Sequence, residues 1–299
     1  MKILGVDLGN YATKTSEGVI FPSRISTGHK ELNKNDTKVD YNDKKYTVGN
    51  GRLELGVQRL NSTLYDLCFL TAIAKSYPSE LNINVNIIVG LPPLQYESTL
   101  KNELEERLSQ LKTQKIIIGG KTITITINKS GIFSESAIVF GEPEKYRKGK
   151  TLVIDLGGGS ADISQFKGLE LVNNTTTKFG MLSLYESMKQ VFNAKEKASY
   201  SADDMGELVD KKTEEIRGNQ EDITYLHDVV ADFVAEICNV VNQSFDTDST
   251  GIVLIGGGAK TLLPYFKKQY KNAIVAENNQ FANANTYKVV GEMLWSDEK

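Results

Sequence analysis

The chain has 299 residues, of which 40% are hydrophobic and 24% are charged. This balance is typical of a globular protein rather than a disordered or membrane chain, and the length allows two domains. A net charge of -3 argues against direct binding to nucleic acid, because phosphate contacts need a basic excess. We see no secretion signal and no apolar run near the roughly 20 residues of a membrane helix. We therefore expect a cytoplasmic protein with no membrane association.

Only two cysteines occur, Cys68 and Cys238, and each lies within an apolar helical pattern. Such residues are more often buried thiols than metal ligands or disulfide partners, and reduced cysteines suit the cytosol. We expect both side chains to be buried and free.

The first half of the chain begins with strands and continues through a polar region into helices and strands. Residues 3–6 form a β-branched strand, and a Gly/Asn turn leads to strands at 13–16 and 19–21. Residues 26–59 are rich in Asn, Lys, Asp and Gly, which predicts a small peripheral insertion. The spacing of apolar residues then predicts a helix at 63–76, a buried strand at 84–90, an amphipathic helix at 97–111 and a half-exposed strand at 121–128.

The second half starts the same series again. Strands are predicted at 151–154, 161–166 and 169–174, with a GGGS turn after the first of them. Helices are predicted at 179–192, 202–217 and 223–245. A buried strand at 251–255 ends at three glycines, and further helices follow at 260–270 and 287–295.

The two halves share one short pattern. Residues 5–14 read GVDLGNYATK and residues 153–164 read VIDLGGGSADIS, so both place Asp-Leu-Gly at the end of an apolar strand. The identity is low, but the shared chemistry favours two related domains that face one another across a cleft.

The paired aspartates Asp7 and Asp155 suggest a metal and phosphate site. A strand that ends in Asp and turns at Gly offers a carboxylate together with backbone N–H groups. Mg²⁺ keeps most of its waters, so two carboxylates could place it on nucleotide phosphates, in part through water. Either aspartate alone would be a turn cap, and the matched contexts favour binding.

Glycines follow both aspartates and a third strand. The glycines after the aspartates would let the backbone approach phosphate oxygens, although a glycine run can also be a flexible turn. They are Gly9 in the first turn and Gly157, Gly158 and Gly159 in the second. Lys14 could return across the first hairpin to a β- or γ-phosphate, or else be a solvated lysine. A third run, Gly256, Gly257 and Gly258, could carry a purine or ribose, or simply allow close strand-to-helix packing. No Walker A sequence is present.

Two strand-end carboxylates, two glycine turns half a chain apart and a third glycine run resemble the ATPase superfamily of actin, sugar kinases and heat-shock chaperones. The resemblance implies an α/β fold of two related actin-like, ribonuclease H-like domains, each a mixed sheet flanked by helices, with a nucleotide cleft between them. It places the first domain at 1–145, with a small insertion at about 22–62 and a completing C-terminal helix at 283–299. The second domain would span 146–282.

The resemblance also assigns roles along the chain. Residues 5–14 and 153–164 become the phosphate motifs, 252–260 the adenosine motif, and 131–141 and 284–294 the two connecting helices. The first connecting helix would present Glu135 to the water that attacks the γ-phosphate, so that Glu135, Asp7 and Asp155 form the catalytic set. The alternative for Glu135 is a glutamate at a helix N-terminus that Ser134 caps.

Further contacts to the nucleotide are implied by position. Gly180 resembles the glycine before the helix near the ribose, and Lys211 and Glu214 are expected on the helix that closes over it. Asn10 and Tyr11 follow Gly9, where the family has a small or hydroxyl residue, so they depart from its pattern of γ-phosphate contacts.

Within the superfamily, the segments DLGNYATK, VGLPPLQY, SES at 134–136 and IGGGAK resemble ParM-type plasmid-segregation actins. This implies an ATPase that uses ATP/ADP and Mg²⁺, polymerises with itself into filaments, and reaches plasmid DNA through a ParR-like DNA-binding adaptor. The alternative within the superfamily is a sugar or acyl kinase with Glu135 as its base. A chaperone-like relative would need a peptide-binding domain, and the tail WSDEK lacks the basic, apolar face of a membrane anchor.

Overall fold

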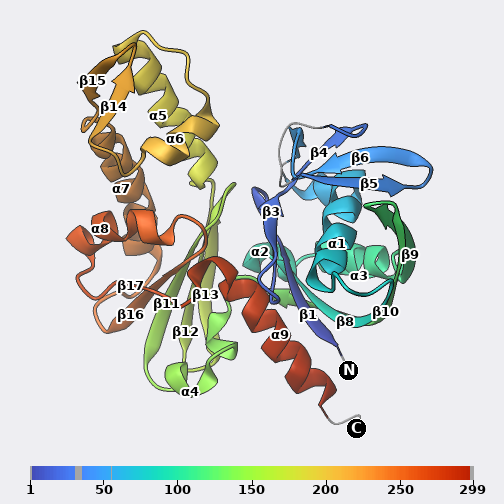
Figure 1. Ribbon diagram of the computed structural model, residues 1–299. Helices are drawn as coiled ribbons and strands as arrows, with labels where there is room; N and C mark the ends of the chain where they lie inside the picture. The colour runs from blue at the N-terminus through green and yellow to red at the C-terminus, as the bar shows by residue number, and fades with distance from the viewer. Residues whose placement is uncertain (1, 31–35, 55, 297–299) are drawn as a thin grey trace. The chain divides into compact units, whose positions relative to one another are not determined.

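A computed structural model describes residues 2–30, 36–54 and 56–296. The chain divides into two compact units (Figure 1). Unit 1 comprises Met1–Arg147 and Phe281–Lys299, and unit 2 comprises Lys148–Gln280. Both ends of the chain therefore belong to the same unit.

Unit 1 is built on a ten-stranded mixed sheet in the order β3-β2-β1-β8-β10-β9-β5-β6-β4-β7. Antiparallel pairs join β1 to β2 and β2 to β3, whereas β8 runs parallel to both β1 and β10. The strands are β1 (Ile3–Leu8), β2 (Ala12–Thr15), β3 (Ile20–Pro22), β4 (Arg24–Thr27), β5 (Thr37–Tyr41), β6 (Lys44–Val48), β7 (Arg52–Leu53), β8 (Asn82–Leu91), β9 (Thr113–Ile118) and β10 (Lys121–Ser134).

Helices lie on both faces of this sheet, against alternate residues of β1. Side chains alternate along a strand, so Leu4 and Val6 join the core under α1, while α9 contacts β1 and β8 from the other face. Figure 1 shows these two helices on opposite sides of β1. The helical segments of unit 1 are η1 (Val57–Asn61), α1 (Thr63–Ser76), α2 (Pro93–Tyr96), α3 (Leu100–Gln110), η2 (Ile138–Phe140), α4 (Pro143–Tyr146) and α9 (Ala282–Trp295). η3 (Asn279–Phe281) precedes α9.

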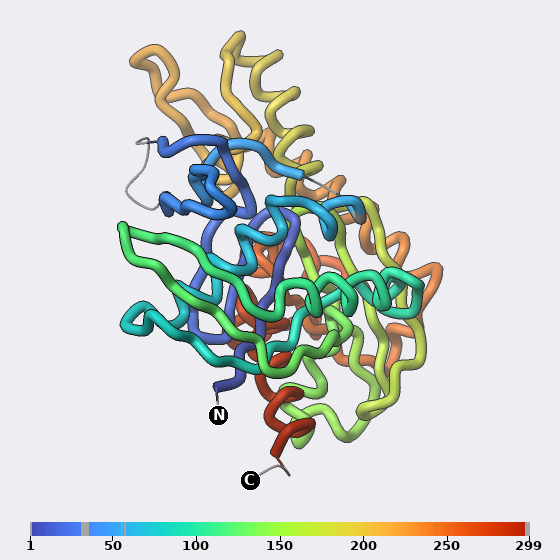
Figure 2. Tube along the Cα trace, turned by 90° about the vertical axis from the view of Figure 1, so that its right-hand side faces the viewer, coloured from blue at the N-terminus to red at the C-terminus, as the bar shows by residue number. Residues whose placement is uncertain are grey.

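Unit 2 is built on a five-stranded sheet in the order β13-β12-β11-β16-β17. Alternate residues of β11 and β16 pack against the helices α5, α7 and α8 in one apolar core. The strands are β11 (Lys150–Leu156), β12 (Ala161–Lys167), β13 (Glu170–Thr177), β16 (Thr250–Ile255) and β17 (Ile274–Val275), and the helices are α5 (Met181–Glu196), α6 (Ala202–Leu208), α7 (Leu226–Ser244) and α8 (Ala259–Gln269). A hairpin of β14 (Thr213–Ile216) and β15 (Asn219–Asp222) lies beyond the sheet at the α5–α6 end of the unit (Figures 1 and 2).

The same five-strand topology occurs in both units. In each, three strands form consecutive antiparallel pairs, and two further strands continue the sheet in parallel beside the first: β3-β2-β1-β8-β10 in unit 1 and β13-β12-β11-β16-β17 in unit 2. Short hairpins and helical crossovers account for these two kinds of pairing. The α/β fold class with two related mixed sheets, expected from the repeated Asp-Leu-Gly, is confirmed.

Two predicted helices are wrong. Residues 202–217 form only the short helix α6, and β14 follows. α6 begins with a capping box between Ser201 and Asp204, and Gly218 at φ 83° turns the chain between the two hairpin strands. The predicted connecting helix at 131–141 is also absent, because β10 continues to Ser134 and only the short η2 follows.

The expectation for the two cysteines is confirmed. Cys68 and Cys238 are free and buried, and burial raises the pKa of each thiol to about 11. Among the described residues, no helix is long and apolar enough to cross a membrane.

Candidate functional site

The first candidate turn lies where β1 ends in unit 1. Asp7 stands opposite Lys14 in the β1–β2 pair, and Lys14 Nζ lies 3.0 Å from Asp7 Oδ2. Only 5% of Asp7 is exposed. The ammonium and the buried carboxylate thus form an ion pair beside the glycine turn.

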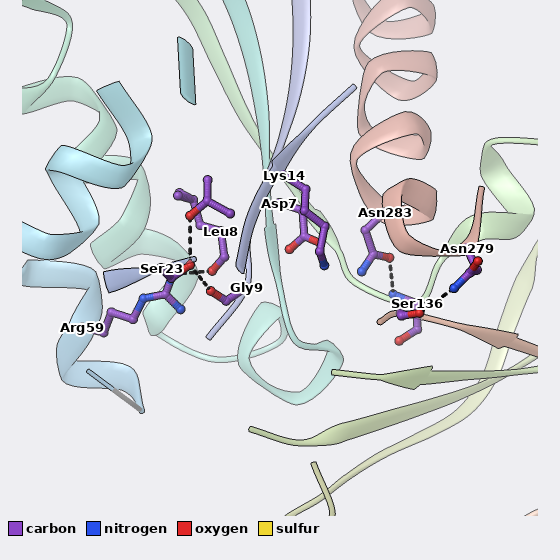
Figure 3. Close-up of polar contacts among 11 residues, drawn as sticks. Asp7, Leu8, Gly9, Lys14, Ser23, Arg59, Ser136, Asn279 and Asn283 are labelled. Atoms are coloured by element: carbon purple, nitrogen blue, oxygen red, sulfur yellow. Dashed lines mark hydrogen bonds and ion pairs between the residues drawn. The ribbon is translucent and has the colours of Figure 1, made fainter. Parts of the chain in front are cut away.

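The carbonyl oxygens of this turn are held from behind. Arg59 Nη2 donates to the Leu8 carbonyl oxygen at 2.6 Å, and Ser23 Oγ donates to that of Gly9 at 2.7 Å (Figure 3). In a trans peptide the N–H points opposite to the C=O, so the N–H groups of Gly9 and Asn10 point away from these donors. The turn therefore presents backbone donors on its other side, which is the arrangement of an anion-binding nest.

The corresponding turn of unit 2 has the same design with different partners. Asp155 ends β11, and the carbonyl oxygens of Gly157 and Gly158 accept from the N–H groups of Met181 and Leu182, each at 2.9 Å. The first turn of α5 thus holds this turn from behind. The N–H groups of Gly158 and Gly159 are directed to the opposite side for the same reason as in unit 1.

Gly180 is placed where α5 meets this turn. It precedes the first residue of α5, and a β-carbon at Gly180 would overlap the backbone of Gly158 and Gly159. Only glycine allows this close approach. Gly180 thus packs against the second glycine turn within unit 2, and its placement near a ribose stays a prediction.

A second carboxylate, Asp162, lies beside Asp155. The two residues are directly opposite each other in the β11–β12 pair, and they are 3% and 6% exposed, respectively. Thr176 Oγ1 donates to Asp162 Oδ1 at 2.6 Å, and Ser160 Oγ donates to Oδ2 at 3.2 Å. Burial raises the pKa of Asp162 to about 6, because these two hydrogen bonds only partly replace lost hydration.

The third glycine run lies directly behind Asp155. Gly256 has φ 86°, and a β-carbon there would overlap Asp155 Oδ1 and the Leu156 backbone. Asn279, which is buried, donates from Nδ2 to the Gly256 carbonyl at 2.7 Å and accepts from the Gly256 N–H. Gly257 is exposed with open space around its Cα, and Gly258 leads into α8. Unit 2 thus brings the second and third glycine motifs together.

Glu135 lies in the chain just after β10 rather than on a helix. Its N–H donates to the Leu91 carbonyl at 2.8 Å, and the next residue, Ser136, has φ 62° and donates its N–H to Asn283 Oδ1 (Figure 3). The left-handed Ser136 turns the chain sharply, which explains why the expected helix does not form. Tyr65 lies on α1, and burial raises the pKa of its hydroxyl. The charge of Arg59 lowers this pKa, whereas the carboxylates of Asp66 and Glu135 raise it further.

Lys211 and Glu214 do not lie on a helix. Lys211 follows α6 and Glu214 is on β14, with Lys211 Nζ 2.8 Å from Glu214 Oε2. Their expected placement on a closing helix is wrong, although they do form a pair.

Sequence reasoning missed several residues of these turns. Asp162 could have been found, because it follows Asp155 by the same seven residues that separate Lys14 from Asp7. Arg59, Ser23 and Asn279 come from distant segments, and no local pattern marks them.

The protein groups fit a magnesium ion bound mainly by water and phosphate. Within the described ranges, no cluster of three or more His, Cys, Asp and Glu side chains is placed to hold a metal. Asp7 and Asp155 are single strand-end carboxylates beside nests of N–H groups. Each turn taken by itself suits Mg²⁺, which uses one or two carboxylates together with substrate phosphates rather than a protein cage.

A duplicated sheet with an aspartate and a glycine turn at the end of its first strand is the architecture of actin-like proteins. Residues 5–137 match the family model described as "Actin like proteins N terminal domain". No curated protein matches the sequence significantly. Residues 5–137 are thus similar to the N-terminal domain of actin-like proteins.

Solved structures extend the likeness to the whole chain. The archaeal actin homolog Ta0583 is 18% identical with a TM-score of 0.83, and the match covers 98% of this chain and 100% of that one. Its complex with ADP gives a TM-score of 0.81, also at 18% identity, with 98% and 100% covered. A 15-stranded ParM filament from Clostridium botulinum is 20% identical with a TM-score of 0.79, with 98% and 100% covered. The chain has the actin-like fold throughout, and ParM structures are among those that share it.

Proposed function

We propose that this protein is an actin-like ATPase that polymerises into filaments in the cytoplasm. The observation that carries the proposal is the pair of matched turns, each with a buried strand-end aspartate and backbone N–H groups turned away from internal donors. Two such turns would hold the phosphates of one Mg-ATP, with Asp7 and Asp155 positioning the metal through water. The ADP complex of the archaeal actin homolog supports a nucleotide as the ligand.

The other predicted residues take roles around the phosphates. The N–H groups of Gly9, Asn10, Gly158 and Gly159 would bind phosphate oxygens, and Lys14 would add a positive charge. Tyr11, Gly157, Gly180 and the Lys211–Glu214 pair would complete the nucleotide contacts, while Gly256–Gly258 would carry the adenosine. Glu135 would orient or deprotonate the attacking water. The nucleotide would lie between a first domain at 1–145 plus 283–299, with its insertion at about 22–62, and a second domain at 146–282.

Filament formation would couple the nucleotide to movement. ATP would close the two domains, protomers would add head to tail, and loss of the γ-phosphate would weaken their contacts. ParM and Alp12 filament structures among the similar folds support self-association. The net charge of -3 supports a ParR-like adaptor, rather than this chain, as the DNA-binding partner in plasmid segregation.

Electron microscopy and light scattering of the purified protein with Mg-ATP, Mg-ADP and a non-hydrolysable ATP analogue test this function, alongside phosphate release. Filaments with ATP and with the analogue, and fewer with ADP, are the expected result. Absence of filaments in every nucleotide state would contradict polymerisation. Phosphorylation of a sugar or acyl acid without filaments would instead favour the small-molecule kinase.

A further inference from the structure

Arg59 is a buried arginine that touches the first glycine turn. It lies on η1 and is only 6% exposed. Nη1 donates to Asn10 Oδ1 at 3.1 Å. Nη2 donates to the Leu8 carbonyl at 2.6 Å, the contact drawn in Figure 3. A residue from the region before α1 therefore contacts both ends of the Leu8–Gly9–Asn10 turn.

Arg59 forms no ion pair with any carboxylate in the part of the chain that the structure describes. Its Nε is buried without an acceptor among the same residues. A guanidinium carries five N–H donors and no acceptor, and burying one without an anion is unfavourable. This imbalance indicates that an anion completes the turn.

Arg59 also determines which way the Asn10 amide faces. Because arginine can only donate, the Asn10 atom that meets it must be the amide oxygen. The Nδ2 group, with its two N–H donors, is then directed away from Arg59. The donors of the Asn10 side chain thus add to the backbone N–H groups of Gly9 and Asn10.

The position of Asn10 identifies the part of the ligand concerned. Asn10 directly follows Gly9, where the resemblance to the actin-like ATPases implies contacts to the γ-phosphate. Arg59 Nη1 donates to the Asn10 amide oxygen at 3.1 Å. Arg59 therefore acts on the residue assigned to the terminal phosphate.

We propose that Arg59 is a positioning residue for the terminal phosphate of a nucleoside triphosphate. It acts by orienting the Asn10 amide and by placing a positive charge behind the turn. The inference rests on the proposed nucleotide-binding function and deepens it. It explains how a chain with asparagine after Gly9 can still bind that phosphate. It also makes Arg59 and Asn10 a coupled pair that distinguishes ATP from ADP.

Isothermal titration calorimetry with Mg-ATP and Mg-ADP tests this on the full chain as wild type, Arg59→Lys, Asn10→Ala and the double variant. Lysine keeps the charge but cannot donate from two fixed nitrogens, so Arg59→Lys should weaken Mg-ATP binding about tenfold and Mg-ADP binding less than about threefold. Asn10→Ala should show the same selective loss. The double variant should bind Mg-ATP no more than about twofold worse than Asn10→Ala, because the two residues act as one unit.

Arg52→Lys is the matched control, since the Arg52 side chain is 75% exposed and pairs with Glu54. It should bind both nucleotides as the wild type does. Three results would overturn the inference: Arg59→Lys loses ATP and ADP affinity equally, it loses neither, or the losses multiply in the double variant. In each case, nucleotide binding by the wild type would still support the proposed function. A wild-type protein that binds neither nucleotide would overturn both. If Arg59→Lys unfolds, Asn10→Ala alone decides through its ATP-to-ADP affinity ratio.

Discussion

Asp155 and Asp162 face each other across the β11–β12 pair, and both carboxylates are buried. The pKa of Asp162 is raised from 3.8 to about 6 by burial. A raised pKa in the folded state means that protonation of Asp162 stabilises the fold. This stabilisation is complete below the pKa of the unfolded chain and disappears as the pH rises through about 6. Two pKa units correspond to about 3 kcal/mol of unfolding free energy.

We therefore expect Asp162→Asn to be more stable than the wild type at pH 8 and to lose most of the difference at pH 4. Asparagine can still accept from Thr176 and can donate to Ser160. Denaturant unfolding in a chelating buffer at several pH values measures this. Parallel pH profiles for the two proteins would contradict the role of Asp162.

Glu135→Ala should slow phosphate release by about 100-fold or more, because a general base contributes 10²–10⁴ to a rate. Mg-ATP affinity should change by less than about twofold, since the carboxylate is assigned to the water rather than to the nucleotide. Filaments should then persist longer after ATP is added. Glu144→Ala is the control, because its side chain is 86% exposed. Unchanged phosphate release would remove Glu135 from the mechanism.

Asp155→Ala should weaken binding of Mg-ATP but have a smaller effect on ATP measured with chelator present. The reason is that the lost carboxylate would position the metal rather than the nucleotide itself. Titration calorimetry with and without Mg²⁺ separates the two effects, and the exposed Asp248→Ala serves as control. Equal losses under both conditions would mean that Asp155 acts only on the fold of the turn.

Gly256→Ala should destabilise the protein by more than Gly218→Ala does. The two glycines have φ of 86° and 83°, so the backbone cost of alanine, about 1–2 kcal/mol, is similar. Only Gly256 would also place its β-carbon against Asp155 and Leu156, whereas nothing lies within 4 Å at Gly218. Thermal unfolding of both variants isolates this steric term. Equal melting temperatures would show that the close approach to Asp155 has no energetic weight.

Much of the fold could be predicted from periodicity. The helix at 63–76 was predicted with the bounds of α1, because apolar residues recur there at helical spacing. The structure adds that Ser62 caps its N-terminus. The strand-turn-strand series of both units was likewise predicted from alternation and glycine. The prediction failed at 202–217, where local helical spacing continued past the end of α6 into a hairpin whose Gly218 turn was not recognised.

The candidate site was less accessible to sequence reasoning. The strand-end aspartates and glycines could be selected because they repeat, and their placement on matching hairpins is as expected. Arg59 and Asn279 could not be selected, since their importance depends on bonds to Leu8 and Gly256 that only the folded chain brings about. The same holds for the turn at Ser136, where a hydrogen bond from its N–H to the side chain of the distant Asn283 stabilises a conformation that serine rarely adopts.

The position of α9 has a consequence for synthesis. This helix covers one face of β1, yet the ribosome makes it after all of unit 2. At about 5–20 residues per second, β1 waits many seconds with an apolar face uncovered. Unit 2, whose residues are contiguous, can fold first. During translation the first unit therefore stays incomplete until α9 emerges, after the whole of unit 2.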